Sequence, residues 1–183
     1  MLAAVAAAGP AAAQLAVRPV TSISGTLRFE ARATVGDFAG TTGVLAGAVT
    51  GGPDLESVRG WVEAPVDSLG TGNGLRDRDM RRSLDSARFP AIRFDLDEVR
   101  PSPAQGDSMV VTLAGRLTIR GVARPVSIPA LLAWQPEGIR LAAMIPLDVR
   151  EYGVRGLSRF LGVLRMDPQI VVRINLLFGQ GEG

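Results

Sequence analysis

Few residue types in this chain could do chemistry. Its 183 residues include 20 basic and 18 acidic side chains but no His and no Cys, and every basic residue is Arg. Without imidazole or thiolate groups, the usual zinc, copper, haem and iron–sulfur sites are excluded, as are Ser-His-Asp and Cys-His nucleophiles. The absence of Lys excludes Schiff-base and P-loop chemistry. An enzyme would depend on carboxylates, hydroxyls, Arg and Tyr152, and the sequence predicts neither a metal site nor a cofactor.

The carboxylates do not form a catalytic pair in the sequence. Asp77 and Asp79 lie two residues apart on a predicted helix, where their side chains point about 200° apart. Asp37 and Asp148 lie beside predicted turns, where Asp is common for conformational reasons. The glycine-rich segment 70–74 lacks the Lys and the spacing of a phosphate-binding loop. We therefore predict a binding protein and no catalytic residues. A hydrolase with an acid pair on adjacent strands is a weaker hypothesis.

Arginines concentrate between residues 76 and 93, where six of them accompany three aspartates. Guanidinium groups bind phosphate well, so Arg81 and Arg82 are candidate ligands for an anionic head group. The alternative is a solvated helix face with ion pairs such as Asp77–Arg81. No nucleic-acid partner is predicted, because the other arginines are scattered and few aromatic side chains could stack on bases.

Most of the chain after residue 16 shows the alternation of a half-buried strand. In residues 27–33, 92–97, 109–120, 126–134, 139–147 and 170–178, apolar side chains occupy every second position. Glycine- and proline-containing turns separate these segments. Alternation in many successive strands predicts antiparallel pairing around one interior, and closure into a barrel removes exposed strand edges. The inward rows combine large side chains with small ones such as Ala31 and Ala143, which leaves some volume along the axis, although each of these residues taken singly is more typical of a packed core.

One segment, residues 74–87, has helical periodicity instead. Met80, Leu84 and Ala87 form an apolar stripe, Asn73 is a candidate N-cap, and Phe89-Pro90 is the expected end. We expect this helix to cover one end of the barrel with Met80 and Leu84 facing the interior.

The N-terminus has the composition of a cleavable signal. Residues 2–8 are a short apolar run, and Ala11 to Ala13 provide small residues before Gln14. This run is shorter than the roughly 20 apolar residues that a membrane span needs. The sequence predicts export, cleavage near Ala13/Gln14, and a single domain over residues 14–183.

Several motifs together resemble the YceI-like family. The Arg-Asp-rich segment 75–81, followed by Phe-Pro-Ala-Ile-Arg-Phe at 89–94, is similar to the family's hallmark helix and strand. The segment 113–122 resembles its Gly-x-Leu-Thr-Ile-x-Gly-Val hairpin, and 36–40 and 152–154 resemble its turns. Asp79 stands where many members carry His, and the stretch between Met80 and Pro90 is about two residues shorter, which indicates a divergent branch.

The resemblance implies an all-β fold, an antiparallel eight-stranded lipocalin-like barrel with one short helix inserted between strands. It also implies a periplasmic, non-enzymatic protein that binds, stores or transports an isoprenoid-type lipid, either a polyprenyl phosphate or a quinone. The ligand-binding residues predicted for the lumen are Phe29, Met80, Leu84, Phe94, Leu113, Leu117, Ile128, Trp134 and Ile174.

Other interpretations remain open on the sequence alone. The same inward rows could form a filled core, and the protein would then be an interaction or stress-related scaffold without a small-molecule ligand. Transient contact with a membrane surface and either a monomer or a homodimer are compatible with the sequence.

Overall fold

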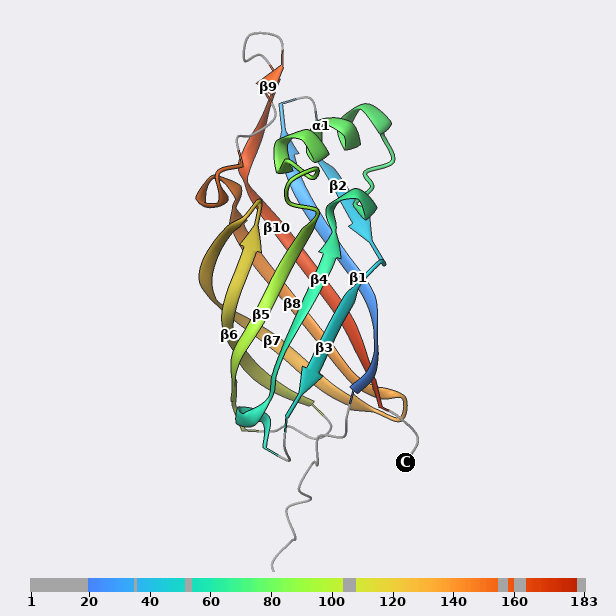
Figure 1. Ribbon diagram of the computed structural model, residues 1–183, viewed down its shortest axis with the longest axis vertical. Helices are drawn as coiled ribbons and strands as arrows, with labels where there is room; N and C mark the ends of the chain where they lie inside the picture. Colours follow the sequence, from blue (N-terminus) through green and yellow to red (C-terminus); the bar gives the residue numbers. More distant parts are fainter. Residues whose placement is uncertain are drawn as a thin grey trace, which may run out of the picture.

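The computed structural model describes residues 20–34, 36–51, 54–103, 108–154, 158–159 and 164–180, so the predicted signal at 1–13 lies outside the described residues. These residues form a curled antiparallel sheet with one α-helix across its upper end (Figure 1). The strands are β1 (Val20–Ala33), β2 (Phe38–Thr42), β3 (Ala46–Thr50), β4 (Arg59–Pro65), β5 (Ala91–Pro101), β6 (Ser108–Ile119), β7 (Val122–Gln135), β8 (Gly138–Asp148), β9 (Ser158–Arg159) and β10 (Leu164–Gln180). The helices are α1 (Gly74–Leu84) and the 3-10 turns η1 (Leu55–Ser57), η2 (Val66–Ser68) and η3 (Val149–Tyr152).

The predicted alternation sets the two faces of the sheet. Along β6, Val111, Leu113 and Ile119 are buried, whereas Val110 and Arg116, at alternate positions of the strand, are exposed. Because successive side chains of a strand point to opposite faces, one row faces the interior and the other faces solvent. The Arg120-Gly121 turn joins β6 to β7, and both residues have positive φ angles of 51° and 74°. This is the geometry of a tight hairpin turn.

The strands follow the order β2-β1-β10-β8-β7-β6-β5-β4-β3, with β9 paired only to β10. The prediction of an antiparallel barrel with one inserted helix is thus confirmed, but the strand count differs from eight. Residues 43–45 interrupt what would be one strand, so that β2 pairs with β1 and β3 pairs with β4. The two-residue β9 adds the other extra strand. Short interruptions of this kind leave no clear mark on hydrophobic periodicity.

The break at residues 43–45 brings the two edges of the sheet together. At these residues the chain stops pairing with β1 and begins to pair with β4. On its other side, β2 contacts the loop after η2, since Thr41 and Gly70 exchange two backbone hydrogen bonds of 2.9 and 3.0 Å. Lower down, Gly47 of β3 lies against the Ile23 side chain of β1.

Helix α1 begins where the sequence predicts. The Asn73 side chain accepts hydrogen bonds from the backbone N–H groups of Leu75 and Arg76, each at 3.1 Å. The predicted end was wrong: the helix stops at Leu84 and does not reach residue 87. Asp85 adopts a left-handed conformation (φ 54°), and the Ser86 N–H donates to the Arg81 carbonyl at 3.0 Å. Left-handed backbone at a non-glycine residue is uncommon, which is why the sequence did not reveal this cap.

Buried apolar side chains form two clusters inside the sheet. One includes Val111, Leu132 and Leu141, and Trp134 packs against it. The other includes Leu147, Tyr152 and other residues near η3. Within the described residues, no helix is long and apolar enough to cross a membrane.

Candidate functional site

The interior of the barrel contains a cavity of about 270 Å³. Its lining comes from every strand of the curled sheet except β9, together with α1 and the loops near η1, η2 and η3. Nearly all of the lining side chains are apolar; the polar or charged exceptions are Glu63, Arg76 and Ser83. The volume lies just below the roughly 300–1,000 Å³ typical of small-molecule sites. Such a site would hold a ligand mainly through burial of apolar surface.

The structure places eight of the nine predicted ligand-binding residues around this cavity. These are Phe29, Met80, Leu84, Phe94, Leu113, Leu117, Ile128 and Ile174. Trp134 does not line the cavity but packs against the adjacent core cluster. It lies opposite Ile139 in the β7–β8 pairing, close to the end of that hairpin. The role of the nine predicted residues in ligand binding stays a prediction.

Several lining residues were missed because they come from short or irregular segments. Phe38 belongs to the five-residue strand β2, and Leu45 and Val49 lie among Gly and Ala around β3. Small neighbours weaken the contrast on which alternation depends. Leu55 belongs to the 3-10 turn η1 and Leu69 directly follows η2, and such short turns have neither strand nor helix periodicity.

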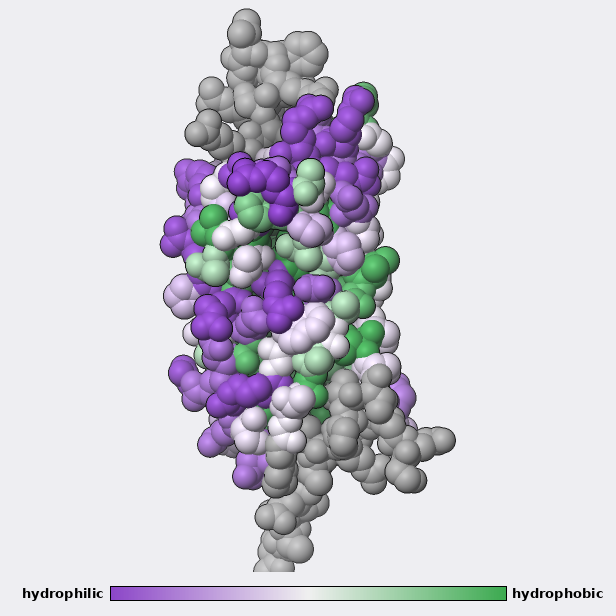
Figure 2. Space-filling model, in the orientation of Figure 1, coloured by the Kyte–Doolittle hydropathy of each residue, from purple (hydrophilic) through white to green (hydrophobic). Residues whose placement is uncertain are grey.

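Helix α1 contributes one face to the cavity. Arg76, Met80, Ser83 and Leu84 line it, and a spacing of three or four residues places side chains on one side of a helix. The same spacing, read four residues back from Met80, could have identified Arg76 in the sequence. Hydrophilic side chains gather on the outer surface over this helix in the upper part of Figure 2.

The two arginines predicted to hold a head group do not line the cavity. Arg81 lies 3.5 Å from the Asp67 carboxylate and donates to its carbonyl at 3.1 Å. Arg82 lies 3.4 Å from Asp79. The predicted Asp77–Arg81 ion pair is replaced by contacts with the preceding loop, because Asp77 accepts hydrogen bonds from the Thr71 N–H at 2.9 Å and hydroxyl at 2.5 Å. These bonds hold the pKa of Asp77 below its usual value.

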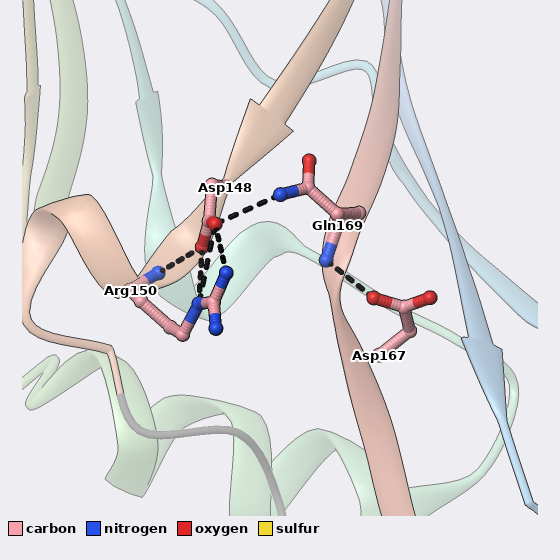
Figure 3. Close-up of polar contacts among 4 residues, drawn as sticks. All are labelled: Asp148, Arg150, Asp167 and Gln169. Atoms are coloured by element: carbon pink, nitrogen blue, oxygen red, sulfur yellow. Dashed lines mark hydrogen bonds and ion pairs between the residues drawn. The ribbon is translucent and has the colours of Figure 1, made fainter.

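A polar network fixes the turn at η3 (Figure 3). The Asp148 carboxylate accepts from the Arg150 guanidinium at 2.6 Å, from the Arg150 N–H at 2.9 Å and from the Gln169 amide at 2.8 Å. The Gln169 N–H donates to Asp167 at 2.8 Å. This network caps η3, whose first residue, Val149, lines the cavity. The hydrogen bonds from Arg150 lower the pKa of Asp148.

The other side chains considered for chemistry have structural surroundings. Tyr152 is 1% exposed within the second core cluster, and this burial raises the pKa of its phenol. It does not line the cavity. Asp79 is buried beside Arg82 on α1, whereas Asp77 contacts the loop at Thr71. Among the described residues, no three His, Cys, Asp or Glu side chains are grouped as a metal site would require.

The fold and the cavity define a small antiparallel β-barrel with an apolar interior and a helix over one end. Residues 19–178 match the family model of the YceI-like domain, and the chain therefore belongs to the YceI-like family. No curated protein matches it.

Solved structures share this fold at low sequence identity. BcnA of Burkholderia cenocepacia has a TM-score of 0.69 at 15% identity, covering 87% of this chain and 98% of BcnA. A domain of Saccharophagus degradans, described as polyisoprenoid-binding and implicated in plant cell wall breakdown, has a TM-score of 0.68 at 15% identity, with the same coverage of 87% and 98%. The Campylobacter jejuni YceI protein has a TM-score of 0.62 at 16% identity, covering 78% of this chain and 85% of that one.

Proposed function

We propose that this protein binds an isoprenoid-type amphiphile in its barrel cavity, and that it stores or carries this lipid without chemical conversion. The observation that carries the proposal is the almost entirely apolar lining of the cavity, which includes Leu55 of η1 and Met80 and Leu84 of α1. The polyisoprenoid-binding description of the Saccharophagus degradans domain supports it. Each Å² of apolar ligand surface buried would contribute about 25 cal/mol, so a hydrocarbon chain needs few polar contacts.

The proposed location is the periplasm, with the leader removed near Ala13/Gln14. The apolar run and small residues at 2–13 support this, as does membership of the family. N-terminal sequencing of protein recovered from the cell envelope should begin near Gln14. Recovery of intact Met1 from the cytoplasm would contradict the assignment.

Native mass spectrometry of the full-length gene product, purified from its host, tests the binding function. We expect an added mass that organic extraction removes and that matches a hydrocarbon-rich lipid in the extract. The delipidated protein should then take up isoprenoid quinones or polyprenyl phosphates. A protein of bare mass that takes up neither would favour the alternative of a ligand-free scaffold.

A further inference from the structure

The two charged residues of the cavity lining, Glu63 and Arg76, differ in their ion pairing. Of the polar or charged lining residues, Glu63 lies 3.4 Å from the Arg93 guanidinium and forms an ion pair with it. Arg76 and Ser83 both come from α1. Within the described part of the chain, no carboxylate forms an ion pair with Arg76. Its neighbour Asp77 is occupied by the Thr71 hydrogen bonds.

The Phe38 ring supports the Arg76 guanidinium at the cavity wall. Its central carbon lies 4.4 Å from the centroid of the Phe38 ring. Phe38 in turn meets Phe29 edge to face, with centroids 6.2 Å apart. Both rings line the cavity. A guanidinium that stacks on a ring uses its flat face, so its N–H donors at the edge stay available for an acceptor.

The other arginines near α1 differ from Arg76 in their ion pairing and in their position relative to the cavity. Arg81 is paired with Asp67, Arg82 with Asp79, and Arg88 with Asp85. None of the three lines the cavity. Arg78 is exposed on the outer face of the helix. Among the described residues, Arg76 is therefore the arginine that lines the cavity, where a ligand inside the barrel would meet it.

We propose that Arg76 binds the oxyanion of the ligand's head group, a phosphate or a carboxylate, while the hydrocarbon chain extends down the barrel toward η1, at the lower end of Figure 1. This inference rests on the proposed function and restricts its ligand class to anionic amphiphiles, which excludes neutral quinones as the preferred ligand. The planar guanidinium fork matches two oxygens of such a head group. A charged hydrogen bond at this site replaces one to water, and the apolar surroundings strengthen it.

Matched pairs of lipids test the inference on delipidated protein. Geranylgeranyl phosphate is compared with geranylgeraniol, and palmitate with hexadecanol, by titration calorimetry. We expect the wild type to bind at least one anion about tenfold or more tightly than its alcohol. Arg76→Gln should remove this preference and leave the alcohol affinities within about twofold. The control Arg78→Gln removes the same charge from the exposed face and should keep the preference. Arg76→Lys, which keeps the charge, should retain part of it.

The outcomes separate the inference from the function on which it rests. Binding of alcohols and anions with equal affinity by the wild type would overturn the role of Arg76 and leave lipid binding intact, as would a preference that survives in Arg76→Gln. Binding of none of the four probes would overturn both. The two anions identify the source: preference for the phosphate indicates a prenyl phosphate, and preference for palmitate indicates a fatty acid.

Discussion

Small side chains on the inner wall control how much of the interior stays open. Ala143 of β8 lines the cavity, whereas Ala31 of β1 is 3% exposed, inward-facing and absent from the lining. The same enlargement at these two alanines should therefore have different consequences. Leucine at position 143 would occupy empty space, and leucine at position 31 would press on atoms already in contact.

We expect Ala143→Leu to change the free energy of unfolding of the delipidated protein by less than about 1 kcal/mol and to reduce lipid uptake. Ala31→Leu should cost about 1–3 kcal/mol, as overpacking of a filled core does. Urea unfolding and lipid titration of both variants give the comparison. Equal destabilisation by the two substitutions would show that the interior at Ala143 is filled and would argue against the binding function.

Asp148 predicts a pH dependence of stability. The hydrogen bonds from Arg150 hold its folded-state pKa below the ordinary 3.8. A lowered carboxyl pKa stabilises the fold fully above the unfolded-state pKa, and this stabilisation is lost as the pH falls through the folded-state pKa. Asp148→Asn should lower the melting temperature at pH 7, and the difference from wild type should shrink below about pH 4.

Thermal melts of Asp148→Asn between pH 7 and pH 3 measure this effect. The control is Asp97→Asn, since the Asp97 side chain is 51% exposed and lies 3.5 Å from Arg116. This control should melt close to the wild type throughout, because exposed ion pairs contribute little. A constant difference between Asp148→Asn and wild type at every pH would contradict the role given to the carboxylate charge.

For single residues of the barrel wall, alternation alone predicted which side chains face the interior, because the side-chain period of a strand is two. It did not predict which inward residues border space and which, like Trp134, border packed neighbours. That distinction depends on how far strands distant in the sequence stand from each other. Nor did it distinguish Arg76 from Arg81 and Arg82, because the loop that carries Asp67 determines where Arg81 is held.

At the scale of elements, α1 both covers the barrel and contributes to its lining. Its two leucines have opposite surroundings: Leu84 lines the cavity and packs against the second core cluster, and Leu75 is 58% exposed. The predicted stripe placed Leu84 correctly. The end of the helix could not be predicted from propensity, because the left-handed Asp85 is held by hydrogen bonds to Arg81 and Arg82 carbonyls.

A charge on the inner side of α1 should disturb the barrel, and the same charge on the outer side should not. We expect Leu84→Asp to lower the free energy of unfolding by about 2 kcal/mol or more, because a carboxylate would enter apolar surroundings, and to reduce lipid retention. Leu75→Asp should stay within about 0.5 kcal/mol of wild type. Urea unfolding and native mass spectrometry report the two effects. Similar behaviour of both variants would mean that α1 does not cover the cavity.

At the scale of the whole molecule, the sheet curls round until β1, β3 and β4 meet. The sequence predicted a closed arrangement from the need to protect strand edges. It did not reveal that one segment would pair with β1 through β2 and with β4 through β3. That exchange of partners depends on contacts between segments far apart in the chain, and the local signal for it is limited to glycines such as Gly43 and Gly47.

Gly47 tests this meeting of strands because a side chain would not fit there. A Cβ atom at Gly47 would lie 2.5 Å from the Trp61 carbonyl oxygen of β4 and 2.6 Å from the Ile23 side chain of β1. At Gly43, a Cβ atom would meet only the Gly25 carbonyl oxygen, at an ordinary 3.5 Å. The backbone oxygen of Trp61 cannot move aside without disturbing the β3–β4 pairing.

We therefore expect Gly47→Ala to lower the free energy of unfolding by about 1–3 kcal/mol through overpacking. Gly43→Ala should be neutral or slightly stabilising, since alanine reduces the entropy of the unfolded chain. Urea unfolding of the two variants gives the stabilities, and hydrogen exchange of the β1 and β3 amides shows whether the loss is local to the junction. A neutral Gly47→Ala variant with unchanged exchange would show that β1, β3 and β4 do not approach as closely as this closure requires.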